Sequence, residues 1–371
     1  MLENKMDQLN TCIQRIFEES EAKIVNFTCE DLAYKTPNFT TAGIFRLSGF
    51  ASINHKQLPW SIILKIIKPD SAEKDNLQHH NYWRREALVF ESKILEELPS
   101  SIKAAKCYLV EEQADGTVWL WMERIDGEYA YTKEQFNYIA EQLGRFNGTY
   151  LTGKKIPDEK WICKNWLKSW TTSSKIYAPN PAKYINQLHN DNERSIWTWF
   201  QDFTDQIDRS LRSLNSLPRV LAHQDLSQMN MLLTQSDTDG ERLILIDWQF
   251  MSISGIGEDL GKMFGVNMSL GVFPNHRYEE YKESLFQNYM KGLKDTGWQG
   301  DESLARYGYC LGTALRSVWE VPQYFSLAAQ LKTDPTTLKL QDRVSQLEQI
   351  INIQRNMATE CIEMNIWAQF S

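Results

Sequence analysis

The sequence feature that most constrains the fold is a pair of apolar segments around a polar loop, within residues 220–247. The first segment leads into a loop that contains Asp225 and Asn230, and the second ends directly at Asp247. Short apolar runs bounded by polar residues are typical of buried strands. A hairpin of two such strands would bring the two carboxylates and the carboxamide together at one end.

The chemistry of these three side chains indicates a role in catalysis. One carboxylate can take a hydroxyl proton, while a carboxamide and a second carboxylate can bind a hard divalent cation. Mg²⁺ prefers oxygen ligands and keeps substrate phosphates in its shell, so few protein ligands suffice. A polar turn followed by an unrelated aspartate is the alternative reading. The ordered set with its flanking strands favours the catalytic one.

The pattern His223-x-Asp225-x₄-Asn230, followed by Asp247, resembles the catalytic core of the aminoglycoside phosphotransferase and choline kinase family, distant relatives of protein kinases. The spacing from Asp225 to Asn230 is also that of the protein-kinase catalytic loop. The resemblance implies that Asp225 orients the acceptor hydroxyl, while Asn230 and Asp247 hold Mg²⁺ on the phosphates of ATP or GTP. It gives His223 a supporting role. Gln249 departs from the family pattern Asp-x-Glu, so a metal role for this residue is not expected.

The hydrophobic pattern predicts two lobes. Strand and helix signals alternate in the first 125 residues: a helix to about residue 28, strands over 38–50 and 60–68, a helix over 83–98, and strands over 105–112 and 117–125. After residue 127 the pattern is mostly helical, and Thr132 with Gln135 forms a candidate capping box. With the resemblance, we expect an α+β, protein kinase-like bilobal fold. Its small mixed β/α lobe would span residues 1–127, and its larger helical lobe 128–371.

The small lobe is expected to bind the nucleotide. Lys65 lies inside the apolar strand WSIILKII, where an unpaired ammonium would be costly, and Glu86 lies on the apolar face of the next helix. Two inward-leaning opposite charges on adjacent elements indicate a pair. The resemblance identifies them as the phosphate-binding lysine and its glutamate. Two alternatives stay open: Lys68, at the end of the strand, and a Lys65 that snorkels to water from an edge strand.

The loop over the phosphates is expected within residues 36–49, which contain two glycines but no GxGxxG motif. Thr41 could still meet phosphate through its hydroxyl or amide. By resemblance, backbone groups near Glu123 and Ile125 would lie beside the adenine, and Met122 behind it.

Acceptor recognition is expected beyond residue 128, where the motifs end. Trp319, Glu320 and Tyr324 could enclose an ammonium or amino sugar by cation–π contacts and ion pairing, although helix packing is the more usual role of any single tryptophan of this kind. Family substrates include aminoglycosides and other antibiotics, choline, ethanolamine, sugars and amino alcohols. We therefore expect an antibiotic- or amino-sugar-like acceptor, as in antibiotic resistance. The alternatives are a choline, ethanolamine, sugar or amino-alcohol kinase, a protein kinase, or a non-catalytic nucleotide-binding module.

Composition also indicates which partners, locations and cysteine-based sites are not expected for this protein. The net charge is −8 and no basic tract occurs, so nucleic-acid binding is not expected. The chain has neither an 18-residue apolar run nor the apolar stretch of a signal peptide, so we expect a cytoplasmic protein without a membrane span. The six cysteines are scattered without a CxxC motif, which predicts neither a disulfide framework nor a zinc site.

Overall fold

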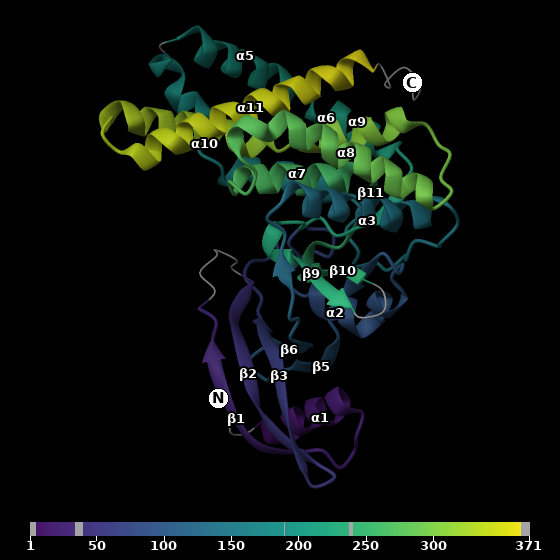
Figure 1. Ribbon diagram of the computed structural model, residues 1–371. Coiled ribbons are helices and arrows are strands. Elements are labelled where there is room, and N and C mark those ends of the chain that lie inside the picture. The colour runs from purple at the N-terminus through teal and green to yellow at the C-terminus, as the bar shows by residue number, and fades with distance from the viewer. Residues whose placement is uncertain (1–4, 34–39, 189, 237–239, 365–371) are drawn as a thin grey trace.

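The structure is a computed structural model that describes residues 5–33, 40–188, 190–236 and 240–364. Figure 1 shows a sheet-rich part, which contains the N-terminal segments, joined to a larger helical part. The strands are β1 (Lys23–Asp31), β2 (Thr41–Ile53), β3 (Lys56–Ile67), β4 (Ile102–Ala104), β5 (Cys107–Glu112), β6 (Val118–Glu123), β7 (Glu128–Tyr129), β8 (Arg219–Ala222), β9 (Met231–Ser236), β10 (Gly240–Leu245) and β11 (Ser252–Gly255).

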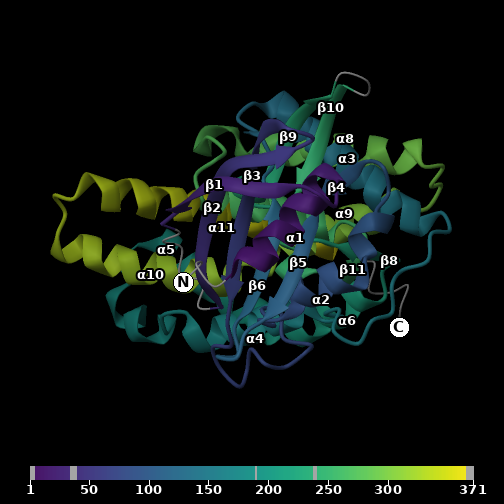
Figure 2. The ribbon, with the colours of Figure 1, turned by 90° about the horizontal axis from the view of Figure 1, so that it is seen from below.

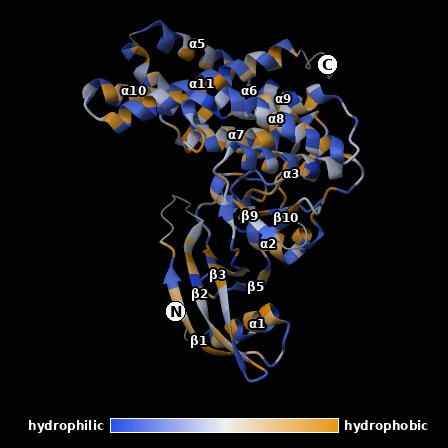
Figure 3. Cartoon of the chain, viewed as in Figure 1, coloured by the Kyte–Doolittle hydropathy of each residue, from blue (hydrophilic) through white to orange (hydrophobic). Residues whose placement is uncertain are grey.

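The helices lie mainly in the second part of the chain. They are α1 (Met6–Phe17), α2 (Arg85–Ser92), α3 (Lys133–Leu151), α4 (Trp166–Tyr177), α5 (Asp191–Asp205), α6 (Ile207–Asn215), α7 (Glu258–Ser269), α8 (Tyr278–Asp295), α9 (Glu302–Ala314), α10 (Ser317–Thr333) and α11 (Leu338–Glu363). Along most of them hydrophilic and hydrophobic residues alternate, as Figure 3 shows, which is the pattern of helices that bury one face.

The small part is built on an antiparallel sheet in the order β1-β2-β3-β6-β5. Helix α1 packs on one face of this sheet, visible in Figure 2, through a hydrophobic cluster that includes Leu9, Leu64 and Trp121. Successive side chains of a strand point to opposite faces. Because Leu64 points into this cluster, Lys65 points to the other face, towards the rest of the molecule.

Two smaller sheets connect the parts of the fold. One has the order β4-β10-β9-β7, with β9 and β10 antiparallel and β4 parallel to β10. The other pairs β8 with β11. The hairpin β9–β10 therefore lies between the five-stranded sheet and the helices, which is where its polar ends can form a site (Figure 1).

Several expected elements differ from the structure. The predicted helix to residue 28 is wrong in its second half, where β1 forms an edge strand, and β11 was not expected. The predicted helix over 83–98 ends at Ser92, because Lys93 adopts a left-handed φ of 62° and a short 3₁₀ turn follows. The capping box of Thr132 and Gln135 is confirmed.

The mixed sheets of the N-terminal part and the helices that follow confirm the expected α+β class. The lobe boundary at residue 127 stays a prediction. In the part of the chain that the structure describes, no helix combines the length and the apolarity needed to cross a bilayer.

The helical part depends on a close crossing of α3 and α8. A Cβ added at Gly144 would lie 2.1 Å from the carbonyl oxygen of Tyr289, and one at Gly292 would lie 2.0 Å from that of Glu141. Real Cβ atoms do not approach oxygen this closely, so both positions need glycine for the helices to touch.

We expect Gly144→Ala to lower the free energy of unfolding by about 1–3 kcal/mol, because the added methyl group forces the helices apart. Gly312→Ala is the matched control: its Cβ would make only an ordinary 3.4 Å contact with Glu258. The control should leave stability unchanged or raise it by up to ~1 kcal/mol through helix propensity. Urea denaturation of both variants measures the difference, and equal effects would contradict the packing argument.

Candidate active site

Helix α7 holds the polar loop that follows β8. The carboxylate of Asp259 accepts hydrogen bonds from the backbone N–H groups of His223 and Gln224, each at 2.9 Å. Asn267, two turns along the same helix, accepts the N–H of Gln228 at 2.8 Å. Gln224 has a left-handed φ of 60°, which is uncommon for a non-glycine residue. Burial raises the pKa of Asp259 to about 6, against these N–H donors, which favour its charged form.

His223 connects this loop to the strand that carries Asp247. Its Nδ1 accepts the N–H of Asp225 at 3.1 Å, so the neutral ring carries its proton on Nε2, which donates to the carbonyl of Ile246 at 3.1 Å. Burial lowers the pKa of His223 to about 4, so the ring is neutral at ordinary pH. This geometry supports the loop, in keeping with the supporting role expected from the sequence.

The hairpin brings the three predicted polar residues to one end. The side-chain Nδ2 of Asn230 donates to Asp225 twice, to its Oδ2 at 3.0 Å and to its backbone carbonyl at 2.9 Å. The N–H of Ile246 donates to the carbonyl of Asn230 at 3.1 Å, and Asp247 follows directly. Both amide hydrogens of Asn230 are directed at Asp225. No described residue bonds to the Oδ1 of Asn230, so this oxygen can bind a cation.

Lys65 joins the small sheet to this hairpin. Its ammonium lies 2.6 Å from Glu86 and 3.0 Å from Asp247, and the side chains of Lys65 and Glu86 are only 5% and 2% exposed. Burial alone would lower the pKa of Lys65, but the carboxylates of Asp247 and Glu86 outweigh it and raise this pKa above its usual value. Burial raises the pKa of Glu86, and Lys65 opposes that rise. The expected pairing is observed, and the contact with Asp247 adds to it.

A cavity of about 430 Å³ lies between the small sheet and the hairpin. This volume is within the range of sites for small molecules and cofactors. All eight of the predicted nucleotide and metal residues line it: Thr41, Lys65, Glu86, Met122, Glu123, Ile125, Asn230 and Asp247. Asp225 is not among the lining residues and contacts the cavity through Asn230.

Arg85 is a site residue that the sequence analysis missed. Its fully buried guanidinium donates to five backbone carbonyls, those of Leu77, His79, His80, Trp161 and Gln249, at 2.7–2.9 Å. These bonds fix α2, and with it Glu86, against the segment after Asp247. The neighbouring Arg84 is identical in type and only half-buried, so the sequence offered no signal to tell the two apart.

Gln249 has a structural role that explains its departure from the family pattern. Its side-chain nitrogen donates to the hydroxyl of Thr40 at 3.0 Å and to the side-chain oxygen of Asn81. The residue is 3% exposed. Its amide is therefore engaged with the loop before β2 and the loop before α2, and is not directed at the cavity.

The three predicted acceptor residues do not share one environment. Glu320 is buried and accepts hydrogen bonds from Arg316 at 3.1 Å and from Ser269 at 2.7 Å. Tyr324 is buried in a hydrophobic cluster with residues of α5 and α11. Trp319 packs near a tryptophan of α4, with ring centres 6.3 Å apart. Their role in acceptor binding stays a prediction, and Glu320 already has a cationic partner.

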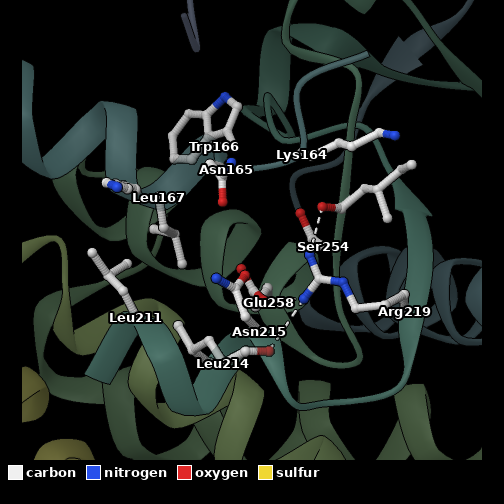
Figure 4. Close-up of a pocket in the computed structure, with 12 residues that line it drawn as sticks. Lys164, Asn165, Trp166, Leu167, Leu211, Leu214, Asn215, Arg219, Ser254 and Glu258 are labelled. Atoms are coloured by element: carbon white, nitrogen blue, oxygen red, sulfur yellow. Dashed lines mark hydrogen bonds and ion pairs between the residues drawn. The ribbon is translucent and has the colours of Figure 1, made fainter. Parts of the chain in front are cut away.

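A second hollow lies beside β8 and β11 (Figure 4). Arg219 crosses it and donates to the carbonyls of Leu214 and Ile253, and Glu258 lies near the same guanidinium at 3.7 Å. Its volume is about 20 Å³. A space of this size holds a single water, so we do not consider it a ligand site.

Comparison with known proteins shows which family the chain belongs to. Residues 61–304, more than half of the chain, match the model of the phosphotransferase enzyme family. The protein belongs to this family. The chain is also similar to choline kinase alpha of Mus musculus, with 24% identity over 208 residues, 55% of this chain and 44% of the mouse protein. The match thus spans less than half the length of that relative.

Solved structures agree with the fold. Amicoumacin kinase hAmiN, in complex with AMP-PNP, Ca²⁺ and Ami, superposes with a TM-score of 0.51 at 13% identity, covering 94% of this chain and 95% of that chain. The ethanolamine kinase Pv091845 of Plasmodium vivax gives a TM-score of 0.48 at 12% identity, covering 88% and 81% of the two chains. At 13% identity the likeness to amicoumacin kinase shows the fold alone, and it confirms the expected protein kinase-like class.

We expect Lys65→Ala to lower the free energy of unfolding by about 3–5 kcal/mol, because it leaves two carboxylates without their buried cation. Lys68→Ala is the control: Lys68 is exposed just beyond β3, and its loss should change stability by less than about 0.5 kcal/mol. Guanidinium denaturation of both variants measures this difference. An unchanged free energy of unfolding in Lys65→Ala would show that the buried pair does not hold the small sheet to the hairpin.

Proposed function

We propose that this protein is a Mg²⁺-dependent kinase that transfers the γ-phosphate of ATP or GTP to a hydroxyl group of a small molecule. The observation that carries the proposal is one connected polar network. Lys65 contacts Glu86 and Asp247 beside the cavity, and Asn230 in the same cavity hydrogen-bonds to Asp225 in the loop beyond it. Membership of the phosphotransferase family supports the same reaction.

The cavity has the two kinds of surface that a nucleotide needs. Apolar side chains, among them Ile44, Met122 and Ile246, would enclose the base, and Lys65 offers a cation to the phosphates. The hydroxyl of Thr41 is buried in the described structure without a hydrogen-bond partner, although it lines the cavity. An unpaired buried hydroxyl is costly, so a phosphate oxygen is a fitting partner.

The oxygen atoms at the end of the hairpin fit a magnesium ion. No described residue bonds to the Oδ1 of Asn230, and Asp247 is 22% exposed and uses one of its oxygens for Lys65. Two protein ligands are typical of Mg²⁺, which completes its coordination shell with water and substrate phosphates. When bound, the ion would offset negative charge on the triphosphate. The left-handed φ of 62° at Asp247 directs the chain away from β10 at this point.

Asp225 is suited to align the acceptor. It lies just outside the cavity, keeps part of its surface exposed, and is held by Asn230 and by the His223 ring through its own N–H. Burial raises the pKa of Asp225, which makes its carboxylate a better proton acceptor. In our proposal Asp225 orients the attacking hydroxyl and takes its proton, late in the reaction because the transition state is loose.

The sequence favoured an antibiotic- or amino-sugar-like acceptor, with choline, ethanolamine, sugars or amino alcohols as alternatives. The relatives named above are kinases of such small molecules, which supports a small acceptor in general. A non-catalytic nucleotide-binding module is the remaining alternative, and the presence of Asp225, Asn230 and Asp247 argues against it. A cytoplasmic location remains a prediction from the sequence.

The test is transfer of labelled γ-phosphate from ATP with Mg²⁺ to a panel of aminoglycosides, choline, sugars and nucleosides. We expect Asp225→Asn to lower kcat by about 10²–10⁴-fold, since it removes the proton acceptor, with nucleotide binding retained. Asp202→Asn, on the exposed face of α5, is the control and should behave as the wild type. Full activity in Asp225→Asn, or loss of activity in the control as well, would reject the assignment.

A further inference from the structure

Two buried cations lie on the helical side of the catalytic loop and take no part in the reaction described above. The first is Lys262 of α7, which is 6% exposed. Its ammonium lies 4.7 Å and 5.0 Å from the ring centres of Trp166 and Trp170 in α4, and 5.8 Å from that of Phe250. The two tryptophans stack with an angle of 10° between their planes. Lys262 therefore packs against an aromatic wall, the name we use for the rings of Trp166, Trp170 and Phe250.

No carboxylate of the described residues lies within ion-pair distance of Lys262. It makes no hydrogen bond and no ion pair with the residues that the structure describes, although an isolated buried ammonium is costly. Burial, followed by the charge of Arg316, lowers the pKa of Lys262 to about 8. Burial raises the pKa of Asp225, and Lys262 is the charge that most opposes this rise. The ammonium therefore lies within electrostatic reach of the catalytic aspartate.

Arg316, at the start of α10, is the second cation. One nitrogen of its guanidinium donates to Glu320 at 3.1 Å and to Ser269 at 3.2 Å. Its Nε and Nη1 are buried without an acceptor in the described part of the chain, and so is the indole nitrogen of Trp170. The guanidinium lies 5.9 Å from the ring centre of Trp170, the ring that Lys262 also faces.

Lysine, arginine and tryptophan side chains can only donate hydrogen bonds. Unused donors of Lys262, Arg316 and Trp170 thus gather around one aromatic ring, and two of the three groups are cationic. Glu320 is the carboxylate bonded to this group: its Oε1 accepts from Arg316 and Ser269, and its Oε2 is buried without a donor among the described residues. A ligand group rich in lone pairs and negatively charged would satisfy these donors, whereas an ammonium would meet like charge.

We propose that Lys262 and Arg316 form the acceptor subsite of this kinase, and that they select hydroxyl acceptors that also carry an anionic group, a carboxylate or a phosphate. This inference rests on the proposed kinase function and narrows its substrate class. It places the hydroxyl near Asp225 and the acidic group between the two cations. Aminoglycosides and choline, which are cationic, would be disfavoured acceptors for the same electrostatic reason.

The test compares three acceptors with the same three-carbon hydroxyl skeleton: glycerol, glycerate and glycerol 3-phosphate. Choline and kanamycin serve as cationic probes. For the wild-type protein with MgATP, we expect kcat/KM for one of the two acidic compounds to exceed that for glycerol by at least ~30-fold, the usual effect of a desolvated charge pair. Which acid is preferred tells a carboxylate site from a phosphate site.

The variants test whether the two cations cause this selectivity. Lys262→Met should reduce the acid-to-glycerol ratio of kcat/KM towards 1, and the double variant Arg316→Met with Glu320→Gln, which removes the ion pair as a unit, should do the same. The ratio is internal to each variant, so a general loss of activity does not affect it. Lys282→Met removes another largely buried lysine, one paired with Glu279 in α8, and should keep the wild-type ratio.

The possible outcomes separate the two proposals. Slow hydrolysis of ATP by the wild type, without preference for an acid, would overturn the anionic subsite and leave the kinase proposal standing. Preference for choline or kanamycin, or an unchanged ratio in Lys262→Met, would also overturn it. If no acceptor reacts, titration of the MgADP-loaded protein with glycerate and glycerol 3-phosphate decides. No binding of either compound at ~10 mM, about tenfold above the usual upper range of KM, overturns the subsite. Absence of both nucleotide binding and hydrolysis would reject the kinase itself.

Discussion

The site depends on one ammonium group held between two carboxylates. Lys65 leaves β3 on the face away from the small hydrophobic cluster, and it meets Glu86 of α2 and Asp247 after β10. Opposite charges ~4 Å apart attract by about 4 kcal/mol at an effective dielectric constant near 20. The three residues come from three separate elements, so this interaction sets the position of the small sheet relative to the hairpin. The cavity proposed to bind the nucleotide lies between these elements.

The rest of the site is rigid because buried polar groups connect its loops. Gln224 and Asp247 both have left-handed backbones, which cost about 1–3 kcal/mol each unless their surroundings hold them. Asp259 holds the first by accepting two N–H groups, and Arg85 holds the segment after the second by donating to the carbonyl of Gln249. Such fully bonded networks fix a single geometry, as a phosphoryl-transfer site requires.

The sequence was informative where chemistry forces a residue type at a fixed spacing. The loop residues Asp225 and Asn230, and the charges of Lys65 and Glu86 inside apolar segments, could be predicted because polar groups in such places need partners. The strand β1 could not, since its side chains are mostly exposed and give no clear alternation of buried positions.

The residues around Lys262 and Arg316, which we propose to bind the acceptor, were less predictable, because they meet only through tertiary structure. Lys262 stands in an ordinary helical sequence, and its partners on the aromatic wall are about 90 residues earlier in the chain. Tyr324 was expected near the acceptor on the basis of local composition, and this role stays a prediction; in the structure Tyr324 is buried in the packing of α10 against α5 and α11. Helical spacing alone does not tell which neighbour a side chain will face.

The central claim is that Asp247 and Asn230 hold the metal on a nucleotide that Lys65 contacts. Calorimetric titration of the wild type and Asp247→Asn with ATP, once with Mg²⁺ and once with EDTA, tests it most directly. The account predicts that the wild type binds ATP at least ~10-fold more tightly with Mg²⁺, and that Asp247→Asn loses this difference, since a hard cation prefers the charged carboxylate. Equal metal dependence in the two proteins would contradict it.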